Sequence, residues 1–151
     1  MIEENIKQLG FELPEVAKPL AAYIPAKRVG NLVMTSGQVP IVKGEMKYSG
    51  KVGSDLSEED GQKAAEICAL NCLAAIKSVI GSLDHIEEVV KLTVFVNSAN
   101  DFTAQPKVAN GASELIGKIF GEKGQHVRSA VGVNQLPLNA AVEIEMIVRV
   151  K

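Results

Sequence analysis

The C-terminal part of the chain carries two runs in which apolar and polar residues alternate. In residues 127–133 valines recur at odd positions, and in residues 142–150 valine, isoleucine and methionine occupy the even positions. A period of two is typical of β-strands, whose successive side chains point to opposite faces. A short connector containing Pro137 joins the two runs. The alternation by itself therefore predicts two strands paired as a hairpin.

Similar patterns predict four more strands. Two extended runs within residues 21–40 flank Gly30-Asn31, a dipeptide that tolerates the positive φ of a tight hairpin turn. The glycine-rich stretch Val42–Val52 predicts one further short strand. Residues 89–97, VVKLTVFVN, are apolar at nearly every position, which indicates a central strand covered on both faces.

Two stretches have the three- and four-residue spacing of amphipathic helices. The first begins at Ser57, whose hydroxyl and following acidic residues favour a helix N-terminus, and runs to about Ile80 before Gly81. The second covers roughly Gln105 to Phe120, with Pro106 in its first turn. Residues 1–20 predict one or two helical turns and then a lead punctuated by prolines.

The order of these elements predicts one domain, residues 1–151, of the α+β or split βαβ class. Six strands would form a mixed sheet with two helices packed on one face. The strand at 89–97 requires cover on its second face as well, and the chain has no further helix to supply it. We therefore expect that face to be buried against other copies of the chain, with closed symmetry.

Charge and composition exclude several classes of function. The net charge is -2, so the chain offers no basic field for nucleic acid, and a nucleic-acid partner is not expected. No apolar run reaches membrane-spanning length, and the N-terminus lacks the apolar core of a signal peptide, so we expect a cytoplasmic protein. The only cysteines, Cys68 and Cys72, share a helix face with core residues, and neither His85 nor His126 has a metal-ligand spacing. No metal and no cofactor are expected.

Arg128 is the residue that most suggests a binding site. Only three of the sixteen basic residues are arginines, and this one opens an apolar strand. A guanidinium group binds a carboxylate through two parallel hydrogen bonds and stays charged when partly desolvated. Arg128 is thus a candidate anchor for a small carboxylic acid, but spacing alone favours a structural ion pair with Glu143 or Glu145.

Other candidate residues are weaker when each is considered alone. Tyr23 is typical of a strand tyrosine that packs with its hydroxyl in water. Ser36 has neither the turn of a nucleophilic serine nor a histidine near it in sequence, which argues against a serine hydrolase. His126 shares a strand face with Arg128 if the strand extends back, so it lies either in the same pocket or on the surface.

Several of these features together resemble the RidA (YjgF/YER057c/UK114) family. The resemblance covers about residues 20–150, in matching order, and its motifs are Tyr23, Gly30-Asn31, TSGQVP from Thr35, VVKLTVFV, Asp101-Phe102, Arg128-Ser129, Leu136-Pro137 and VEIE from Val142. It implies a chorismate-mutase-like fold and a homotrimer with sites in the clefts between subunits. It also implies that the last strand is inserted between two other strands, not paired in a hairpin.

The resemblance further implies hydrolysis of reactive 2-imino acids to 2-keto acids and ammonia, without a cofactor. Arg128 matches the arginine that holds the substrate carboxylate, and Glu143 the glutamate near the attacking water. Three positions match residues that line the pocket, Tyr23, Ser36 and Gly37, and Asn110 matches an asparagine of the second helix.

Some positions depart from the deaminase pattern. Ala130 stands where active members commonly carry Cys or Thr, Gly132 and His126 also differ, and the segment 102–128 is longer than in short bacterial forms. These departures indicate a longer-chain subgroup and leave its natural substrate open. Two alternatives remain: a non-enzymatic trimer that binds a carboxylate metabolite or a partner protein in the same cleft, and the endoribonuclease or translation-inhibitor role described for some members.

Overall fold

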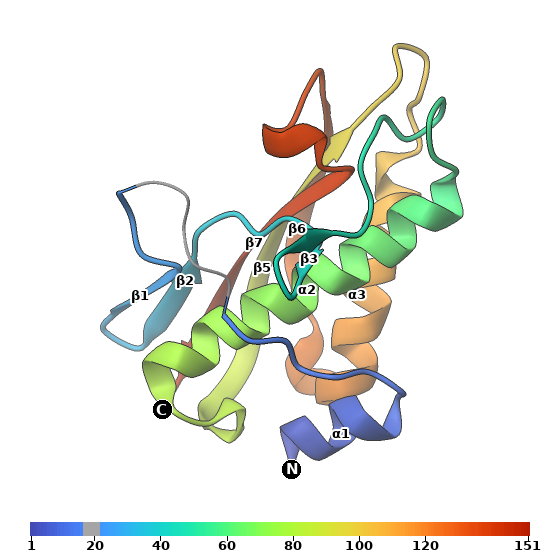
Figure 1. Ribbon diagram of the computed structural model, residues 1–151. Coiled ribbons are helices and arrows are strands. Elements are labelled where there is room, and N and C mark those ends of the chain that lie inside the picture. The colour runs from blue at the N-terminus through green and yellow to red at the C-terminus, as the bar shows by residue number, and fades with distance from the viewer. Residues whose placement is uncertain (17–21) are drawn as a thin grey trace.

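The main sheet contains five strands in the order β1-β2-β7-β5-β6. The computed structural model describes residues 1–16 and 22–151 (Figure 1), so residues 17–20 of the expected lead and the start of the 21–40 stretch lie outside it. The strands are β1 (Ala26–Val29), β2 (Leu32–Thr35), β5 (Ile86–Asn97), β6 (Val127–Val133) and β7 (Val142–Val150). Only β5 and β6 are parallel, and α3 (Gln105–Phe120) connects them as a βαβ unit.

The last strand, β7, lies between β2 and β5, with antiparallel partners on both sides. The insertion that the resemblance implied is therefore confirmed, and the hairpin that alternation alone predicted is wrong. The connector after β6 contains Leu138 and Asn139, both with positive φ. It carries the chain away from the edge strand β6 and back to the centre of the sheet.

The expected count of six strands in one sheet is wrong. The stretch after residue 40 forms β3 (Ile41–Val42) and β4 (Glu45–Met46), a small hairpin separate from the main sheet. Its turn residues Lys43 and Gly44 have φ of 52° and 79°. Two consecutive positive φ values are typical of a tight hairpin turn, so this segment folds back on itself and does not extend the sheet.

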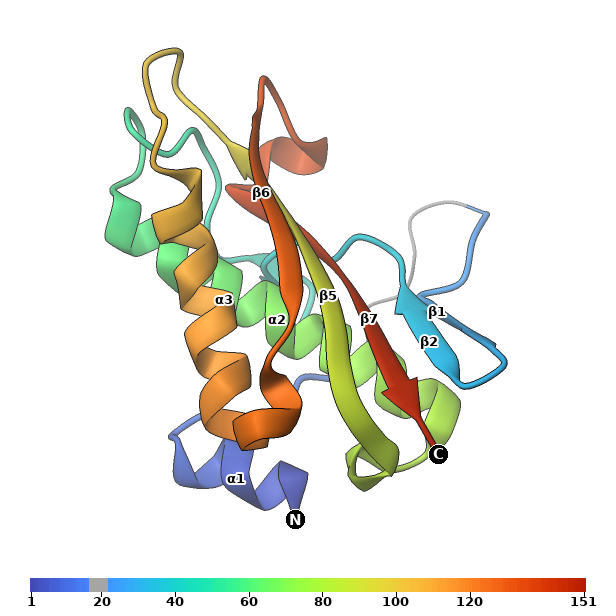
Figure 2. The ribbon, with the colours of Figure 1, turned by 180° about the vertical axis from the view of Figure 1, so that it is seen from behind.

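Two helices, α2 (Glu58–Ile80) and α3, cover one face of the sheet, as expected (Figures 1 and 2). The side chain of Ser57 accepts a hydrogen bond from the backbone N–H of Asp60, and the Asp60 carboxylate accepts one from the backbone N–H of Ser57. Gly81 ends the helix with a φ of 82°. Among the helices of residues 1–16 and 22–151, none has the length and apolar character needed to cross a membrane.

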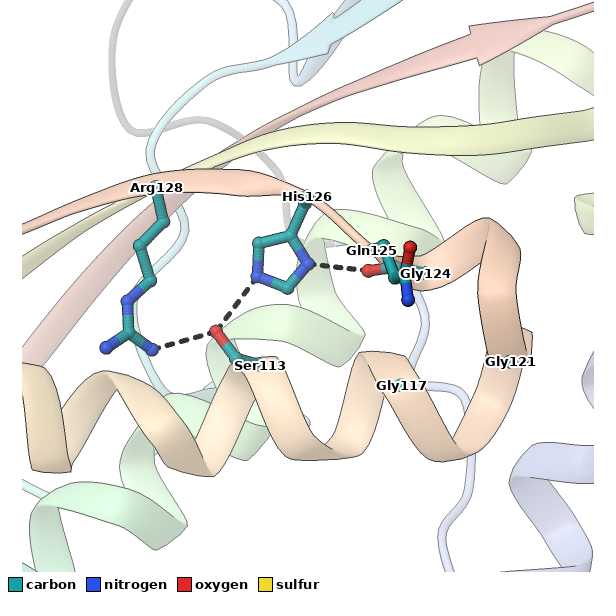
Figure 3. Close-up of a pocket in the computed structure, with 7 residues that line it drawn as sticks. All are labelled: Ser113, Gly117, Gly121, Gly124, Gln125, His126 and Arg128. Carbon is teal, nitrogen blue, oxygen red and sulfur yellow. Dashed lines mark hydrogen bonds between the residues drawn. The ribbon is translucent and has the colours of Figure 1, made fainter.

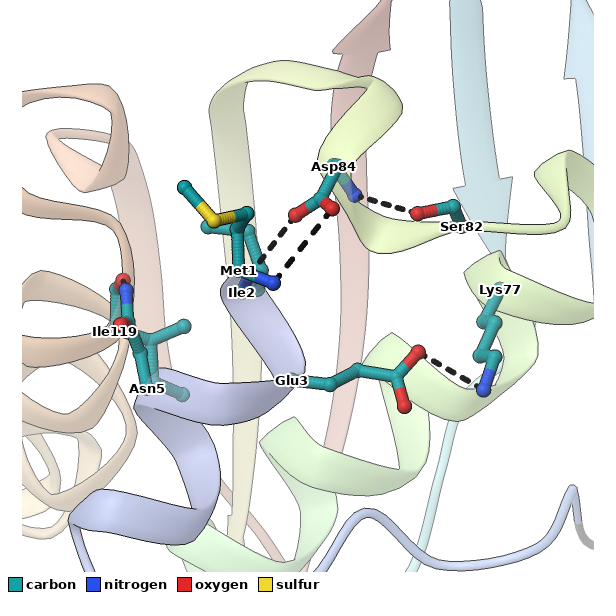
Figure 4. A network of polar contacts seen from close by, with 8 residues as sticks. All are labelled: Met1, Ile2, Glu3, Asn5, Lys77, Ser82, Asp84 and Ile119. Atoms are coloured by element: carbon teal, nitrogen blue, oxygen red, sulfur yellow. Dashed lines mark hydrogen bonds and ion pairs between the residues drawn. The ribbon is translucent and has the colours of Figure 1, made fainter.

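A short N-terminal helix, α1 (Ile2–Gln8), packs against the ends of the two long helices (Figure 4). The backbone N–H of Ile2 donates to Asp84, and the Asn5 side chain donates to the carbonyl of Ile119. Glu3 forms an ion pair with Lys77 of α2 at 2.9 Å. These contacts fix the first part of the predicted lead on the domain.

The second face of the sheet is open in the single chain. On β5 the side chains that face the helices, such as Leu92 and Val94, are fully buried, whereas Thr93 and Phe95 on the opposite face are only partly buried. The open face also carries exposed valines, including Val127 at 66% and Val131 at 44% exposure. The chain thus buries one face of β5 by itself and leaves the other uncovered.

Candidate functional site

Arg128 lies near the start of the edge strand β6 and points toward α3. Its Nη1 donates to Asn110 Oδ1 at 2.8 Å and to Ser113 Oγ at 3.0 Å, and its Nη2 donates to the carbonyl of Pro106 at 3.0 Å. A guanidinium group has five N–H donors. Within the described part of the chain, these contacts leave Nε–H and one Nη2–H free, and this pair can make a side-on bidentate contact with a carboxylate.

The groove beside Arg128 has a volume of about 430 Å³ (Figure 3). Its lining includes His126, which directly precedes β6, and Ser113 from α3. His126 Nε2 lies 2.9 Å from Ser113 Oγ, and His126 Nδ1 lies 2.6 Å from the carbonyl oxygen of Gly124. Of the two positions left open for His126, the structure shows the one in the pocket. Ser113 was not found from the sequence, because a serine in a helix gives no signal of its spatial neighbours.

A second group of candidate residues surrounds a bulge between β2 and β7. The last residue of β2 that pairs with β7 is Met34, opposite Ile147, and pairing with β7 resumes at Gln38, opposite Ile144. Between these points, the three residues 35–37 oppose the two residues 145 and 146 of β7. The Thr35 hydroxyl accepts the hydrogen bond from the backbone N–H of Met146. Bulges of this kind redirect side chains and are frequent beside active sites.

The bulge brings Gly37 into direct contact with Glu143 of β7. A Cβ atom added to Gly37 would lie 2.7 Å from Glu143 Oε2 and 2.8 Å from its Cδ, so a larger residue at 37 would displace the carboxylate. Burial, and to a smaller extent the charge of Glu145, raises the pKa of Glu143. A carboxylate whose pKa is raised is a better proton acceptor for water than an ordinary one.

Ser36 lies within this bulge, and Tyr23 lies in the segment just before β1. The Ser36 hydroxyl donates to the carbonyl of Ile24 at 2.7 Å, and its backbone N–H donates to the carbonyl of Pro25. These bonds tie the bulge to the segment that carries Tyr23, which is 51% exposed just before β1. Ser36 is thus a structural donor within one chain, and Tyr23 has its ring open to solvent.

The single chain does not bring Arg128 and Glu143 together. Arg128 pairs with Leu92 on the helix face, and Glu143 pairs with Phe95 on the open face. Two strand spacings across and three residues along place their Cα atoms about 14 Å apart, on opposite faces of the sheet. The structural ion pair with Glu143 or Glu145 is therefore wrong for the single chain: within residues 1–16 and 22–151, Arg128 contacts only neutral acceptors.

Neither cysteine has the surroundings of a reactive or metal-binding thiol. Cys68 and Cys72 are fully buried, and their thiols lie near the carbonyls of Val142 and Ile144. Burial raises the pKa of Cys72 to about 12 and that of Cys68 well above its usual value. Across the described residues, no three His, Cys, Asp or Glu side chains gather as a metal site requires.

Comparisons with known proteins agree with the fold and the motifs. The family described as "YjgF/chorismate mutase-like, putative endoribonuclease" matches residues 3–149. Protein TCP17 of Trypanosoma cruzi is 43% identical over 97% of this chain and 92% of its own length. A crystal structure of Atu1372, of unknown function, from Agrobacterium tumefaciens has a TM-score of 0.94 and 45% identity, covering 99% of this chain and 92% of that one.

A relative with an assigned activity is more distant. The 2-iminobutanoate/2-iminopropanoate deaminase of Dermatophagoides farinae is 32% identical over 89% of this chain and 91% of its own length. The family match over nearly the whole chain, the inserted last strand and the two helices on one face lead to one conclusion. This chain belongs to the YjgF/RidA family.

Proposed function

We propose that the chain hydrolyses 2-imino acids to 2-keto acids and ammonia. The observation that carries this proposal is the state of Arg128, whose guanidinium is held by three neutral acceptors while two of its donors have no partner among the described residues. A preformed fork of this kind suits the planar carboxylate that 2-imino and 2-keto acids share. The deaminase name of a relative at 32% identity supports the same substrate class.

The reaction needs a nucleophilic water and an acceptor for its proton. Arg128 and Asn110 would orient the substrate carboxylate, and Glu143 would hold the water against the electrophilic C2 atom. The water oxygen forms a bond to C2 as one of its protons passes to Glu143. The substrate nitrogen takes this proton as it accepts the electron pair of the C=N π bond, which gives a carbinolamine. The hydroxyl proton of the carbinolamine then passes by way of Glu143 to the nitrogen, the C–N bond breaks with its electron pair on nitrogen as the C2–O double bond forms, and ammonia leaves a 2-keto acid.

The other candidate residues would shape the pocket around this water. Gly37 leaves room for the Glu143 carboxylate because a Cβ at this position would overlap it. Ser36 fixes the bulge, and Tyr23, exposed in one chain, would cover the substrate from its side. In this proposal Arg128 and Asn110 hold the substrate carboxylate, and Glu143 acts on the reacting water.

We infer that two copies of the chain contribute to each site, in a homotrimer. Arg128 and Glu143 lie about 14 Å apart on opposite faces of one sheet, too far for both to contact a small acid. The open face with its exposed valines supplies an apolar surface for association. A cleft between copies would bring the Arg128 group of one copy to the Glu143 group of its neighbour.

The test is a coupled assay in which an amino-acid oxidase or a dehydratase generates the imine. We expect the purified chain to accelerate imine loss, and we expect Arg128→Ala to remove that acceleration. Lack of acceleration by the wild-type chain, or full activity in Arg128→Ala, would contradict the proposal. Tight binding of 2-ketobutyrate without turnover would instead favour a non-enzymatic carboxylate-binding trimer, and RNA cleavage that disappears with Arg128→Ala would favour an endoribonuclease.

A further inference from the structure

Arg128 is held in part by a series of polar groups that makes no direct contact with the proposed substrate position. Nη1 of Arg128 donates to Ser113 Oγ, Ser113 Oγ lies 2.9 Å from His126 Nε2, and His126 Nδ1 lies 2.6 Å from the carbonyl oxygen of Gly124 (Figure 3). The series runs from the middle of α3 across to the start of β6. Neither Ser113 nor His126 has a part in the reaction described above.

The chemistry of the last partner sets the direction of every bond in the series. A carbonyl oxygen only accepts hydrogen bonds, so Nδ1 of His126 carries the proton. In the neutral imidazole Nε2 is then an acceptor, and the Ser113 hydroxyl donates to it. The lone pairs of Ser113 Oγ are thereby turned toward Arg128, whose Nη1 only donates.

The groove next to Arg128 explains why such a support is needed. It has a volume of about 430 Å³, and three of its lining residues, Gly117, Gly121 and Gly124, have no side chains. An arginine side chain with several rotatable bonds would have room to swing into this space. Held in one orientation, it loses less entropy when it binds a carboxylate.

We propose that Ser113 and His126 are positioning residues for Arg128. His126 fixes the Ser113 hydroxyl, and Ser113 in turn keeps Nη1 toward α3, so that Nε–H and the free Nη2–H point at the carboxylate. This inference rests on the proposed function only in that Arg128 binds the carboxylate of the acid. It identifies two residues that the resemblance does not supply. Both determine how tightly the acid binds.

The primary test measures the binding of 2-ketobutyrate by calorimetry in variants of the two residues. We expect Ser113→Ala to weaken binding by about three- to tenfold, the usual effect of one lost hydrogen bond, and Ser113→Thr to retain most of the affinity because it keeps the hydroxyl. In the coupled assay Ser113→Ala should raise KM more than it lowers kcat, because the carboxylate contact is present in both the ground state and the transition state.

Two substitutions of His126 separate positioning from a merely structural role. The side-chain amide of glutamine reaches the place of Nε2, where its oxygen can accept a hydrogen bond from the Ser113 hydroxyl. The side-chain amide of asparagine reaches only the place of Nδ1, where its NH2 group can donate to the carbonyl of Gly124. We therefore expect His126→Gln to bind 2-ketobutyrate more tightly than His126→Asn. The reverse order would overturn the proposal, because it would mean that the bond to Gly124 is the one that matters.

His85 and Ser78 provide matched controls. His85 Nδ1 also contacts a carbonyl, that of Ile80, and the structure gives its Nε2 no described partner. Ser78 on α2 donates to the carbonyl of Ala75. His85→Gln, His85→Asn and Ser78→Ala should leave 2-ketobutyrate binding unchanged.

A last measurement keeps this inference separable from the proposed function. Nitrogen-15 relaxation of the Arg128 Nε–H group reports its mobility in the free protein, with no substrate present. We expect Ser113→Ala to raise that mobility whether or not the chain is a deaminase. Unchanged mobility would overturn the positioning role, as would covalent labelling of Ser113 by a fluorophosphonate, which would identify it as a nucleophile.

Discussion

At the scale of single residues, Glu143 combines two opposing properties. Burial raises the pKa of its carboxyl, so the fold favours the neutral form, yet the proposed reaction needs the charged form as proton acceptor. The stability that the raised pKa provides is present in acid and is lost as pH rises through the pKa of the folded state. Activity should therefore increase over the same pH range in which this residue ceases to stabilise the fold.

Replacement of Glu145 tests this assignment. Its charge is the second cause of the raised pKa of Glu143, after burial. In Glu145→Gln we expect the pKa of Glu143 to fall toward its usual value, and the acid limb of the kcat/KM profile to move to lower pH. A profile recorded from pH 4 to 8, about the range in which carboxyls and histidines titrate, would show the shift; an unmoved limb would mean that another group is the base.

Gly37→Ala tests the contact between the bulge and the carboxylate. A Cβ at this position meets the end of the Glu143 side chain, which can rotate away, so we expect a change in unfolding free energy of less than about 1 kcal/mol. The carboxylate would leave the position where it holds water, so kcat should fall by about 10²-fold or more. Denaturant unfolding and the coupled assay give the two values.

The Glu143→Ala background supplies the control for that experiment. With the carboxylate removed, the methyl group that Gly37→Ala introduces no longer meets the side chain at position 143, so the two substitutions should not be additive in either activity or stability. Additive losses would show that residue 37 acts through some other contact.

At the scale of elements, local sequence determines the helices and the central strands. The cap at Ser57, the glycine after Ile80 and the alternation in β7 are local signals, and the structure has the predicted elements there. The alternation does not predict the separation of β3–β4 from the sheet, because the glycine-rich stretch that contains the Lys43-Gly44 turn has the pattern of one short strand. The position of β7 depends on contacts between distant segments, which periodicity does not contain, and only the resemblance supplied it.

The candidate site residues also differ in whether local sequence or contacts between distant segments reveal them. Arg128 and Glu143 belong to motifs whose order in the chain is visible in the sequence, and Asn110 is supplied by the resemblance alone. Ser113 could not be found in this way, because its importance depends on two neighbours that the βαβ unit brings beside it in space. The contact of Gly37 with Glu143 likewise exists only because a bulge shifts the register between β2 and β7.

The capping box at the start of α2 gives a prediction at this scale. Ser57 and Asp60 satisfy each other's backbone N–H groups, so Ser57→Ala should lower the free energy of unfolding by about 1 kcal/mol. Ser54, in the loop just before, is the matched control, because only its backbone takes part in the described hydrogen bonds. Equal unfolding midpoints for Ser57→Ala and Ser54→Ala in urea would contradict the role of the cap.

At the scale of the whole molecule, the two groups of candidate residues lie on opposite faces of one sheet. The open face leaves Val127 and Val131 of β6 exposed, although Arg128 and Ala130 on the other side of this strand are partly buried. An apolar face of this kind and a divided set of polar residues are both explained if neighbouring copies complete each other's sites.

A mixing experiment tests whether the site is shared. Arg128→Ala and Glu143→Gln should each be inactive alone, because each lacks one half of every site. When the two are unfolded together and refolded as mixed assemblies, a site that takes Arg128 from one copy and Glu143 from its neighbour regains both groups. For random one-to-one mixing in a ring of head-to-tail contacts, roughly one site in four is restored, so about a quarter of wild-type activity should return. Inactive mixtures would place both residues of a working site in the same chain, and the exposed valines would then need another explanation.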